Sequence, residues 1–168
     1  MDYRKFLLAA GLAVAVAVPA NAASVSASTN ANGKALILIP LTLTKVADLE
    51  FGTVIESSTS GTVNVPADGS VPSVTGGVTA IASAPGSRAQ FAGAGTPGEL
   101  VNIFLAPPAN LKDTNGDLLP ISMSLESSNI TIDNSHAFFV GVGGTVTVAA
   151  NQPDGDYTGT FTVLAQYN

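Results

Sequence analysis

The chain has 168 residues, 46% hydrophobic and only 11% charged, and its formal net charge is −6. This length fits one domain with a packed core, and the absence of cysteine excludes disulfides, thiolate metal sites and cysteine nucleophiles. Six Lys and Arg against twelve Asp and Glu offer no basic surface for nucleic acid, and seventeen Gly with ten Pro favour strands and turns over long helices.

Residues 1–22 have the pattern of a secretory signal peptide. Arg4 and Lys5 precede the apolar run Phe6–Val18, and a small-x-small cleavage site ends at Ala22. The apolar run would form roughly 20 Å of helix, which is shorter than the ~30 Å hydrocarbon core of a bilayer. We therefore expect an exported product that begins at Ala23, with no transmembrane segment in the mature chain. Cleavage removes Asp2, Arg4 and Lys5, leaving four bases, eleven acids and a net charge of −7.

Residues 23–33 form a polar N-terminal extension with weak alternation. In an extended chain one face would carry Val25, Ala27, Thr29 and Ala31. Such a segment is either a disordered tail or a strand that pairs with a partner sheet.

Residues 34–168 are predicted to form one all-β domain. The run 35–46 is apolar on both faces in its first half, which predicts a strand buried on both sides. Pro40 cannot donate to a ladder, so the strand either borders the sheet there or changes partner sheet at that point. Further strands are predicted at 49–55, 61–65, 77–81, 88–92, 99–105, 119–125, 140–149 and 157–167. A long surface loop is predicted at 66–77, and turns at 84–87 and 93–98. About nine short strands without helical periodicity predict an immunoglobulin-like β-sandwich, with a barrel as the alternative.

The last predicted strand alternates along its whole length. Tyr157, Gly159, Phe161, Val163, Ala165 and Tyr167 share one face, and threonines dominate the other. This pattern places Phe161 and Val163 in the core.

Residues with chemical potential are few. His136 is the single histidine, so one chain cannot build a histidine metal cluster, and we expect an ordinary loop histidine. The remaining carboxylates are scattered among strand ends and loops, where solvated surface charge is their expected role. No catalytic motif is present, so we expect neither an enzyme nor a bound cofactor.

The segment Asp113–Asp117 begins like a calcium-binding loop, with Asp113, Asn115 and Asp117 at alternating positions. Leu118 stands where such a loop has glycine, and Ser124 where it has the bidentate glutamate. A polar hairpin loop with Asn-Gly turn chemistry is therefore the preferred interpretation, and calcium is a weak candidate.

Several short motifs follow one another along the chain in an order and spacing that resemble those of a known family. They are Pro40-Leu41, residues 48–52, 61–63 and 76–78, the stretch Gly155–Val163 and the closing Tyr167-Asn168. Together they resemble a "domain of unknown function" family of small secreted proteobacterial β proteins. More distantly, the chain is similar to the major subunit of the Mat or common pilus, an alpha-class chaperone–usher pilin.

The resemblance implies a sandwich that lacks its final strand. In chaperone–usher pilins a glycine and a penultimate aromatic residue mark the C-terminal assembly strand, and Gly155 and Tyr167 occupy those positions here. A periplasmic chaperone, delivering subunits to an outer-membrane usher, would fill the open groove in transit. The N-terminal segment of the next subunit would then replace it. Residues 23–32 would be that donor strand, with Val25, Ala27, Thr29 and Ala31 inward.

These expectations combine into a pilin-like, non-enzymatic subunit of a surface filament or adhesive coat, found at the cell surface after passage through the periplasm. The alternative is a self-complete sandwich that binds a carbohydrate or other ligand as a secreted monomer. A secreted hydrolase ranks third, because nothing in the sequence brings two carboxylates together.

Overall fold

The structure, a computed structural model, describes residues 28–168, so the expected signal peptide, Val25 and Ala27 lie outside the described residues. Leu36–Asn168 form one compact unit, here called the β body. The described residues form strands and no helix, which confirms the all-β prediction. They therefore contain no helix long and apolar enough to cross a membrane.

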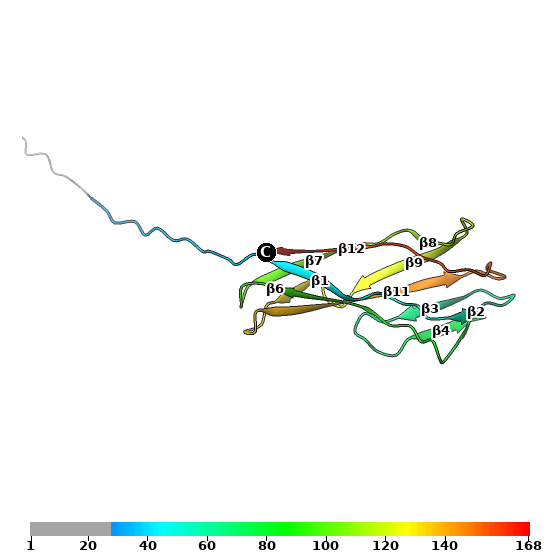
Figure 1. Ribbon diagram of the computed structural model, residues 1–168. Helices are drawn as coiled ribbons and strands as arrows, with labels where there is room; N and C mark the ends of the chain where they lie inside the picture. The colour runs from blue at the N-terminus through cyan, green and yellow to red at the C-terminus, as the bar shows by residue number, and fades with distance from the viewer. Residues whose placement is uncertain (1–27) are drawn as a thin grey trace, which may run out of the picture. The chain divides into compact units, whose positions relative to one another are not determined.

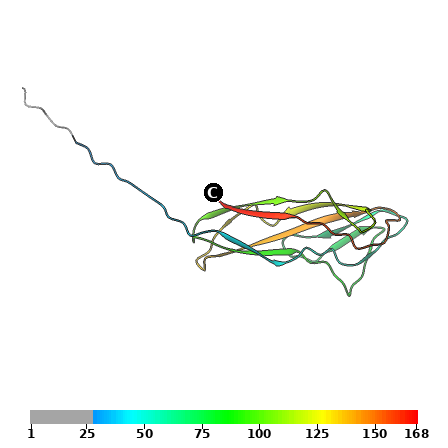
Figure 2. The same ribbon diagram turned by 45° about the horizontal axis from the view of Figure 1, so that its top comes forward.

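The strands are β1 (Thr42–Ala47), β2 (Val54–Ile55), β3 (Gly61–Val65), β4 (Ser73–Gly76), β5 (Thr79–Ala80), β6 (Ala89–Ala94), β7 (Leu100–Ala106), β8 (Asn110–Lys112), β9 (Leu118–Leu125), β10 (Asn129–Thr131), β11 (Ala137–Val148) and β12 (Thr162–Tyr167). The largest sheet has the order β1-β6-β11-β3-β4, with β9 on the other edge of β11 and β8 beside β9. A second sheet has the order β10-β7-β12, and β2 pairs with β5. All pairings are antiparallel, and Figures 1 and 2 show β7 and β12 in one layer above β1, β6 and β11 in the other.

The main hydrophobic core lies between these two layers. Val101 and Ile103 of β7 are buried against Phe138, Val140 and Val142 of β11. A second cluster, built on Val63, Val78, Leu119, Val146 and Val148, lies under the other half of β11. Strand β11 serves both clusters because its first half pairs with β6 and its second half with β3.

Glycines in the middle of β11 make room for a crossing loop. Gly141 and Gly143 are buried, and a Cβ at either position would collide with the backbone at Val65 to Ala67. Because only glycine fits so close an approach, the chain after β3 can run directly over the outer face of β11.

The predicted strand 35–46 is wrong in its first half. Strand β1 begins at Thr42, and residues 35–41 have no regular structure, with Ile37 90% exposed and Leu36 67% exposed. Pro40 has no N–H for a ladder, so pairing with β6 begins only after it. The stretch is apolar but not buried, because no neighbouring strand covers it among the described residues.

Short pairings account for most other differences. The predicted strands 49–55 and 77–81 shrink to the two-residue strands β2 and β5, and the predicted loop 66–77 contains β4. Strand β6 continues through the start of the turn predicted at 93–98, because Gly93 and Ala94 pair with both β1 and β11. Strands β8 and β10 have three residues each. Segments this short show no periodic signal, so the sequence does not predict them.

The predicted strand 157–167 is correct only from Thr162 onward. Its partner β7 ends at Ala106, before Pro107 and Pro108, which have no N–H to donate. Upstream of β12 the chain pairs instead at a single bridge, Lys112 with Thr158.

The predicted inward face of β12 contacts the main core. Phe161, Val163, Ala165 and Tyr167 all pack against it, half-buried, and the Phe161 ring meets the Phe91 ring edge-on at 6.1 Å between centroids. We expect Phe161→Ala to lower the free energy of unfolding by about 3 kcal/mol, the low end for a buried Phe, because the side chain is only half-buried. Thr160→Ala, at an exposed position, should change it by less than about 0.5 kcal/mol. Equal denaturant midpoints for the two variants would show that the face is assigned wrongly.

Candidate functional site

Strands β1 and β12 each leave one edge without a strand partner among the described residues, as do β4, β8 and β10 elsewhere in the β body. Strand β1 ends the larger sheet and pairs only with β6, and β12 ends the second sheet and pairs only with β7. An unpaired edge exposes a row of N–H and C=O groups that can pair with another strand. The two strands contact each other, and we call the region along their free edges the edge groove.

The core side chains beside the edge groove are incompletely covered. Leu41 and Leu43 from the β1 side and Val163 and Ala165 from β12 are half-buried. At the centre of the same core, by contrast, Val101 of β7 and Val142 of β11 are both 0% exposed. The apolar interior is thus fully buried at its centre and partly exposed along the edge groove.

A cavity of about 220 Å³ lies where the chain continues beyond β1 and ahead of β12. Its apolar lining includes Leu49, Phe51, Leu111, Met123 and Phe161. Asp48 and Glu50 lie at the same cavity, and Asp48 pairs with Lys45 at 2.7 Å. The cavity extends the apolar, partly open region past the strands themselves.

Tyr167 closes the other end of the edge groove. Its hydroxyl donates a hydrogen bond to the carbonyl oxygen of Ile39 at 2.9 Å and accepts one from the backbone N–H of Thr96 at 2.8 Å. The N–H of Ile39 in turn donates to the Thr96 hydroxyl at 2.9 Å. These bonds fix the chain just ahead of β1, a role for the penultimate tyrosine that alternation alone did not indicate.

Tyr167→Phe tests this connection. The variant keeps the ring in the core but removes both hydroxyl hydrogen bonds, so we expect a loss of about 1–2 kcal/mol in the free energy of unfolding. Amide exchange at Ile39 should also become faster, as measured by NMR. Unchanged exchange at Ile39 would show that the tyrosine hydroxyl does not hold this segment.

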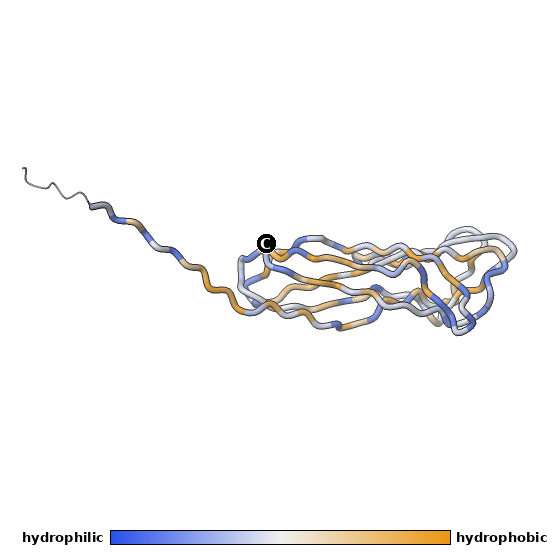
Figure 3. The backbone as a smooth tube through the Cα atoms, turned by 90° about the horizontal axis from the view of Figure 1, so that it is seen from above, coloured by the Kyte–Doolittle hydropathy of each residue, from blue (hydrophilic) through white to orange (hydrophobic). Residues whose placement is uncertain are grey.

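The chain ahead of β1 carries an exposed apolar stretch, here called the entry segment (Leu36–Ile39). Three of its four side chains are exposed, Ile37 most of all at 90%, and Leu38 is half-buried. Figure 3 shows it as an orange run ahead of the strands. Exposed apolar side chains in sequence are costly in water and indicate a surface that becomes covered on association.

The other predicted assembly residues fall into different environments. Thr29 and Ala31 are exposed and without regular structure. Gly155 lies in a loop near the Asp113 side chain, outside any strand. Tyr157 contacts the second core cluster and donates a hydrogen bond to the Pro153 carbonyl, and Gly159 lies against Leu111. Of the predicted C-terminal set, the structure therefore brings Phe161, Val163 and Tyr167 to the edge groove.

The weak calcium candidate forms a loop that satisfies its own carboxylate. Asp113 is buried, and its Oδ1 accepts hydrogen bonds from the N–H groups of Asn115, Gly116 and Asp117 at 3.0, 2.8 and 2.7 Å. Its Oδ2 accepts one from the Asn115 side chain. A cation would have to compete with these donors, and no cluster of three or more His, Asp or Glu suited to a metal occurs within residues 28–168.

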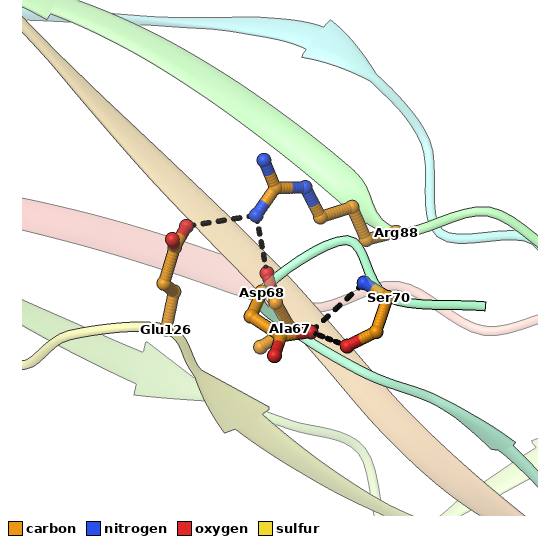
Figure 4. A network of polar contacts seen from close by, with 5 residues as sticks. All are labelled: Ala67, Asp68, Ser70, Arg88 and Glu126. Atoms are coloured by element: carbon orange, nitrogen blue, oxygen red, sulfur yellow. Dashed lines mark hydrogen bonds and ion pairs between the residues drawn. The ribbon is translucent and has the colours of Figure 1, made fainter. Parts of the chain in front are cut away.

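A polar network holds the loop between β3 and β4 (Figure 4). Arg88 Nη1 donates to the Ala67 carbonyl at 2.6 Å and pairs with Glu126 at 2.8 Å. Asp68 accepts hydrogen bonds from the hydroxyl and the N–H of Ser70, and these, the hydroxyl first, hold the pKa of its carboxyl below the ordinary value. The network therefore anchors the loop between β3 and β4 over β11, and the Glu126 carboxylate is already used in its ion pair with Arg88.

His136 occupies a tight turn ahead of β11, with a φ of 68°. Its Nδ1 lies 3.3 Å from the Gly95 carbonyl, and the neighbouring Asp133 accepts hydrogen bonds from Ser135 and Ala137. The Ser135 hydroxyl, followed by the Ala137 N–H, lowers the pKa of Asp133. The geometry is that of a turn, in which the adjacent Ser135 hydroxyl donates to Asp133.

A family model described as a domain of unknown function, DUF4402, matches residues 41–167. The chain belongs to the DUF4402 family. The match covers nearly the whole β body and begins two residues after the end of the entry segment, so both β1 and β12 belong to the DUF4402 domain. Comparisons with curated proteins and with solved structures gave no match.

Proposed function

We propose that this protein is a non-enzymatic, pilin-like subunit of a bacterial surface filament, assembled from copies of itself. The observation that carries the proposal is the edge groove, where the unpaired edges of β1 and β12 lie beside half-buried side chains of the main core. An edge of this kind invites a strand from another chain, which supplies main-chain ladder bonds and apolar side chains together.

In this proposal the β body is an incomplete immunoglobulin-like sandwich. The missing strand would lie between β1 and β12 and would pair with the free edge of β12. It would also cover Leu43 and Val163, which are half-buried now. Supplied by the next copy, head to tail, such a strand generates an open filament because the contact never closes on itself.

The N-terminal extension is the proposed donor. Val25, Ala27, Thr29 and Ala31 would face inward, and in an extended chain Ile37 lies in the same phase because every second residue shares a face. The four upstream residues have small side chains, so Ile37 would contribute the largest apolar contact on this face. The entry segment thus gives the donor strand the anchor that its polar part lacks.

The entry segment is poorly placed to fill the groove of its own subunit. Its last residue, Ile39, is held by Tyr167 and Thr96 and leads directly into β1. Occupying the adjacent groove would require the chain to reverse at that fixed point. Insertion into a second copy needs no such reversal.

The proposal includes export and protected transit. Residues 1–22 would be removed as a signal peptide, and the product would pass the periplasm and reach the cell surface. A groove that exposes apolar side chains is an aggregation hazard, so a periplasmic chaperone and an outer-membrane usher are the proposed partners before assembly.

Polymerisation of the mature chain with Val25 and Ala27 both replaced by Asp tests the donor strand. Two carboxylates would have to enter an apolar groove, so we expect filaments to disappear from electron micrographs while the subunit melts at an unchanged temperature. Deleting residues 23–32 should act in the same way, and a peptide of residues 23–39 should stop filament growth when added in excess.

Two results would contradict this account. Filaments that persist with both Asp substitutions would exclude residues 23–32 as inserted residues. A monomer that loses stability with them would show that the segment belongs to its own sheet, as in a self-complete sandwich that binds its ligand as a monomer.

A further inference from the structure

The outer face of the sheet β10-β7-β12 carries no ionisable side chain. None of the three strands contains Asp, Glu, Lys, Arg or His. The mature chain as a whole has eleven acids against four bases. A neutral sheet face on so acidic a chain is a distinct surface, here called the neutral face.

Strand register arranges the neutral face in cross-strand rows, and the two central rows carry the features that matter here. Leu164 lies directly opposite Phe104, and both are exposed, at 56% and 52%. In the next row, Asn102 lies between Asn129 and Gln166. Directly opposite residues of an antiparallel pair project on the same side of the sheet, so an apolar pair adjoins a row of three amides.

We propose that the neutral face is a lateral interface that binds the same face of a second copy. Depletion of charge together with an exposed aromatic side chain is the compositional signature of an interface core. Two copies, each with a net charge of −7, repel one another, and the neutral face allows contact without bringing carboxylates together. A basic or acidic partner would find no ionisable group to recognise on these strands.

Self-complementarity favours a second copy over another neutral partner. In a two-fold arrangement the same patch meets itself, so its groups must match their own kind. Phe104 and Leu164 can pack against the same apolar side chains of the second copy. The amides can hydrogen-bond to the amides of the second copy, because each amide carries both donors and an acceptor. The interface uses side chains on the sheet face, whereas the proposed donor strand uses the edges of β1 and β12, so the two contacts can coexist.

The outer face of the larger sheet provides the control. Phe139 is more exposed than Phe104, at 70%, but its cross-strand neighbour on β6 is only Ala92. Arg88 and Glu126 lie over the same strand at Gly141. A lone exposed ring on a charged face does not indicate an interface.

The chain contains no cysteine, so a single introduced cysteine can be cross-linked at one known position. Gln166→Cys places a thiol on the neutral face, and Thr44→Cys places one on the opposite outer face beside Ala92. With a short bismaleimide cross-linker, the mature Gln166→Cys protein should form covalent dimers whose yield rises with concentration, and Thr44→Cys should remain monomeric. Adding Phe104→Asp should reduce the Gln166→Cys yield about tenfold, whereas adding Phe139→Asp should leave it unchanged.

The same cross-linking in an Ile37→Asp background separates this contact from head-to-tail assembly. Dimers that persist there support a lateral interface that does not depend on the donor strand, even if filaments never form. Absence of dimers, equal yields at positions 166 and 44, or no effect of Phe104→Asp would overturn the proposal. Binding of a neutral oligosaccharide that Phe104→Asp abolishes, without any dimer, would also overturn it and identify the face as a glycan platform.

Discussion

Ile37→Asp is expected to abolish filament formation while leaving the subunit folded. Ile37 is 90% exposed in the β body and contributes almost nothing to its core, so the thermal midpoint of the monomer should change little. In the proposed filament the same side chain is buried against a neighbour, where an unpaired carboxylate is strongly unfavourable. Sedimentation velocity should therefore show no species larger than the lateral dimer that the neutral face would form.

Ile55→Asp is the matched control for this variant. It makes the same chemical change at another exposed isoleucine, 56% exposed on β2 and away from the edge groove. We expect Ile55→Asp to form filaments at the wild-type rate. If both variants polymerise, the entry segment is not inserted, and if neither does, added charge alone explains the loss.

Phe138→Ala should have the largest effect on stability of any single truncation considered. Phe138 is 3% exposed, and its ring lies over Gly93 of β6 so closely that a Cβ at that glycine would overlap it. Removing a buried Phe side chain costs about 3–5 kcal/mol, a large share of the roughly 5–15 kcal/mol that stabilises a typical domain.

The neighbouring Phe139 is the internal comparison, because it is 70% exposed on the opposite face of the same strand. Phe139→Ala should change the free energy of unfolding by less than about 0.5 kcal/mol in a denaturant titration. Similar losses for the two variants would mean that the register of β11 is reversed.

Alternation predicted the inward face of the last strand. Phe161 and Val163, predicted to be core residues, pack against the main core ahead of and in β12. Val63, Val65, Val101 and Ile103 are likewise buried at every second position of the predicted strands 61–65 and 99–105. These are places where a period of two extends over five or more residues and one face is buried. The all-β fold follows from that signal together with the abundance of glycine and proline.

The entry segment is where sequence reasoning failed, and the reason is physical. An unbroken apolar run has the same sequence pattern whether it is buried in its own sheet or exposed, so the pattern alone predicts a buried strand at Leu36–Ile39. Only the position of Pro40 and the start of pairing at Thr42 separate the two cases. Likewise, the alternation around Tyr167 placed its ring in the core but could not reveal its bonds to Ile39 and Thr96, which are distant in sequence.

Hydrogen exchange along β12 tests the central claim most directly. In the Ile37→Asp monomer, the amides of residues 162–167 that point away from β7 should exchange rapidly, because that edge has no partner. In wild-type filaments the same amides, and those of residues 35–38, should become protected together as the inserted strand forms its ladder. Protection that is already present in the monomer, or that does not appear in the assembled protein, would contradict insertion at the edge groove.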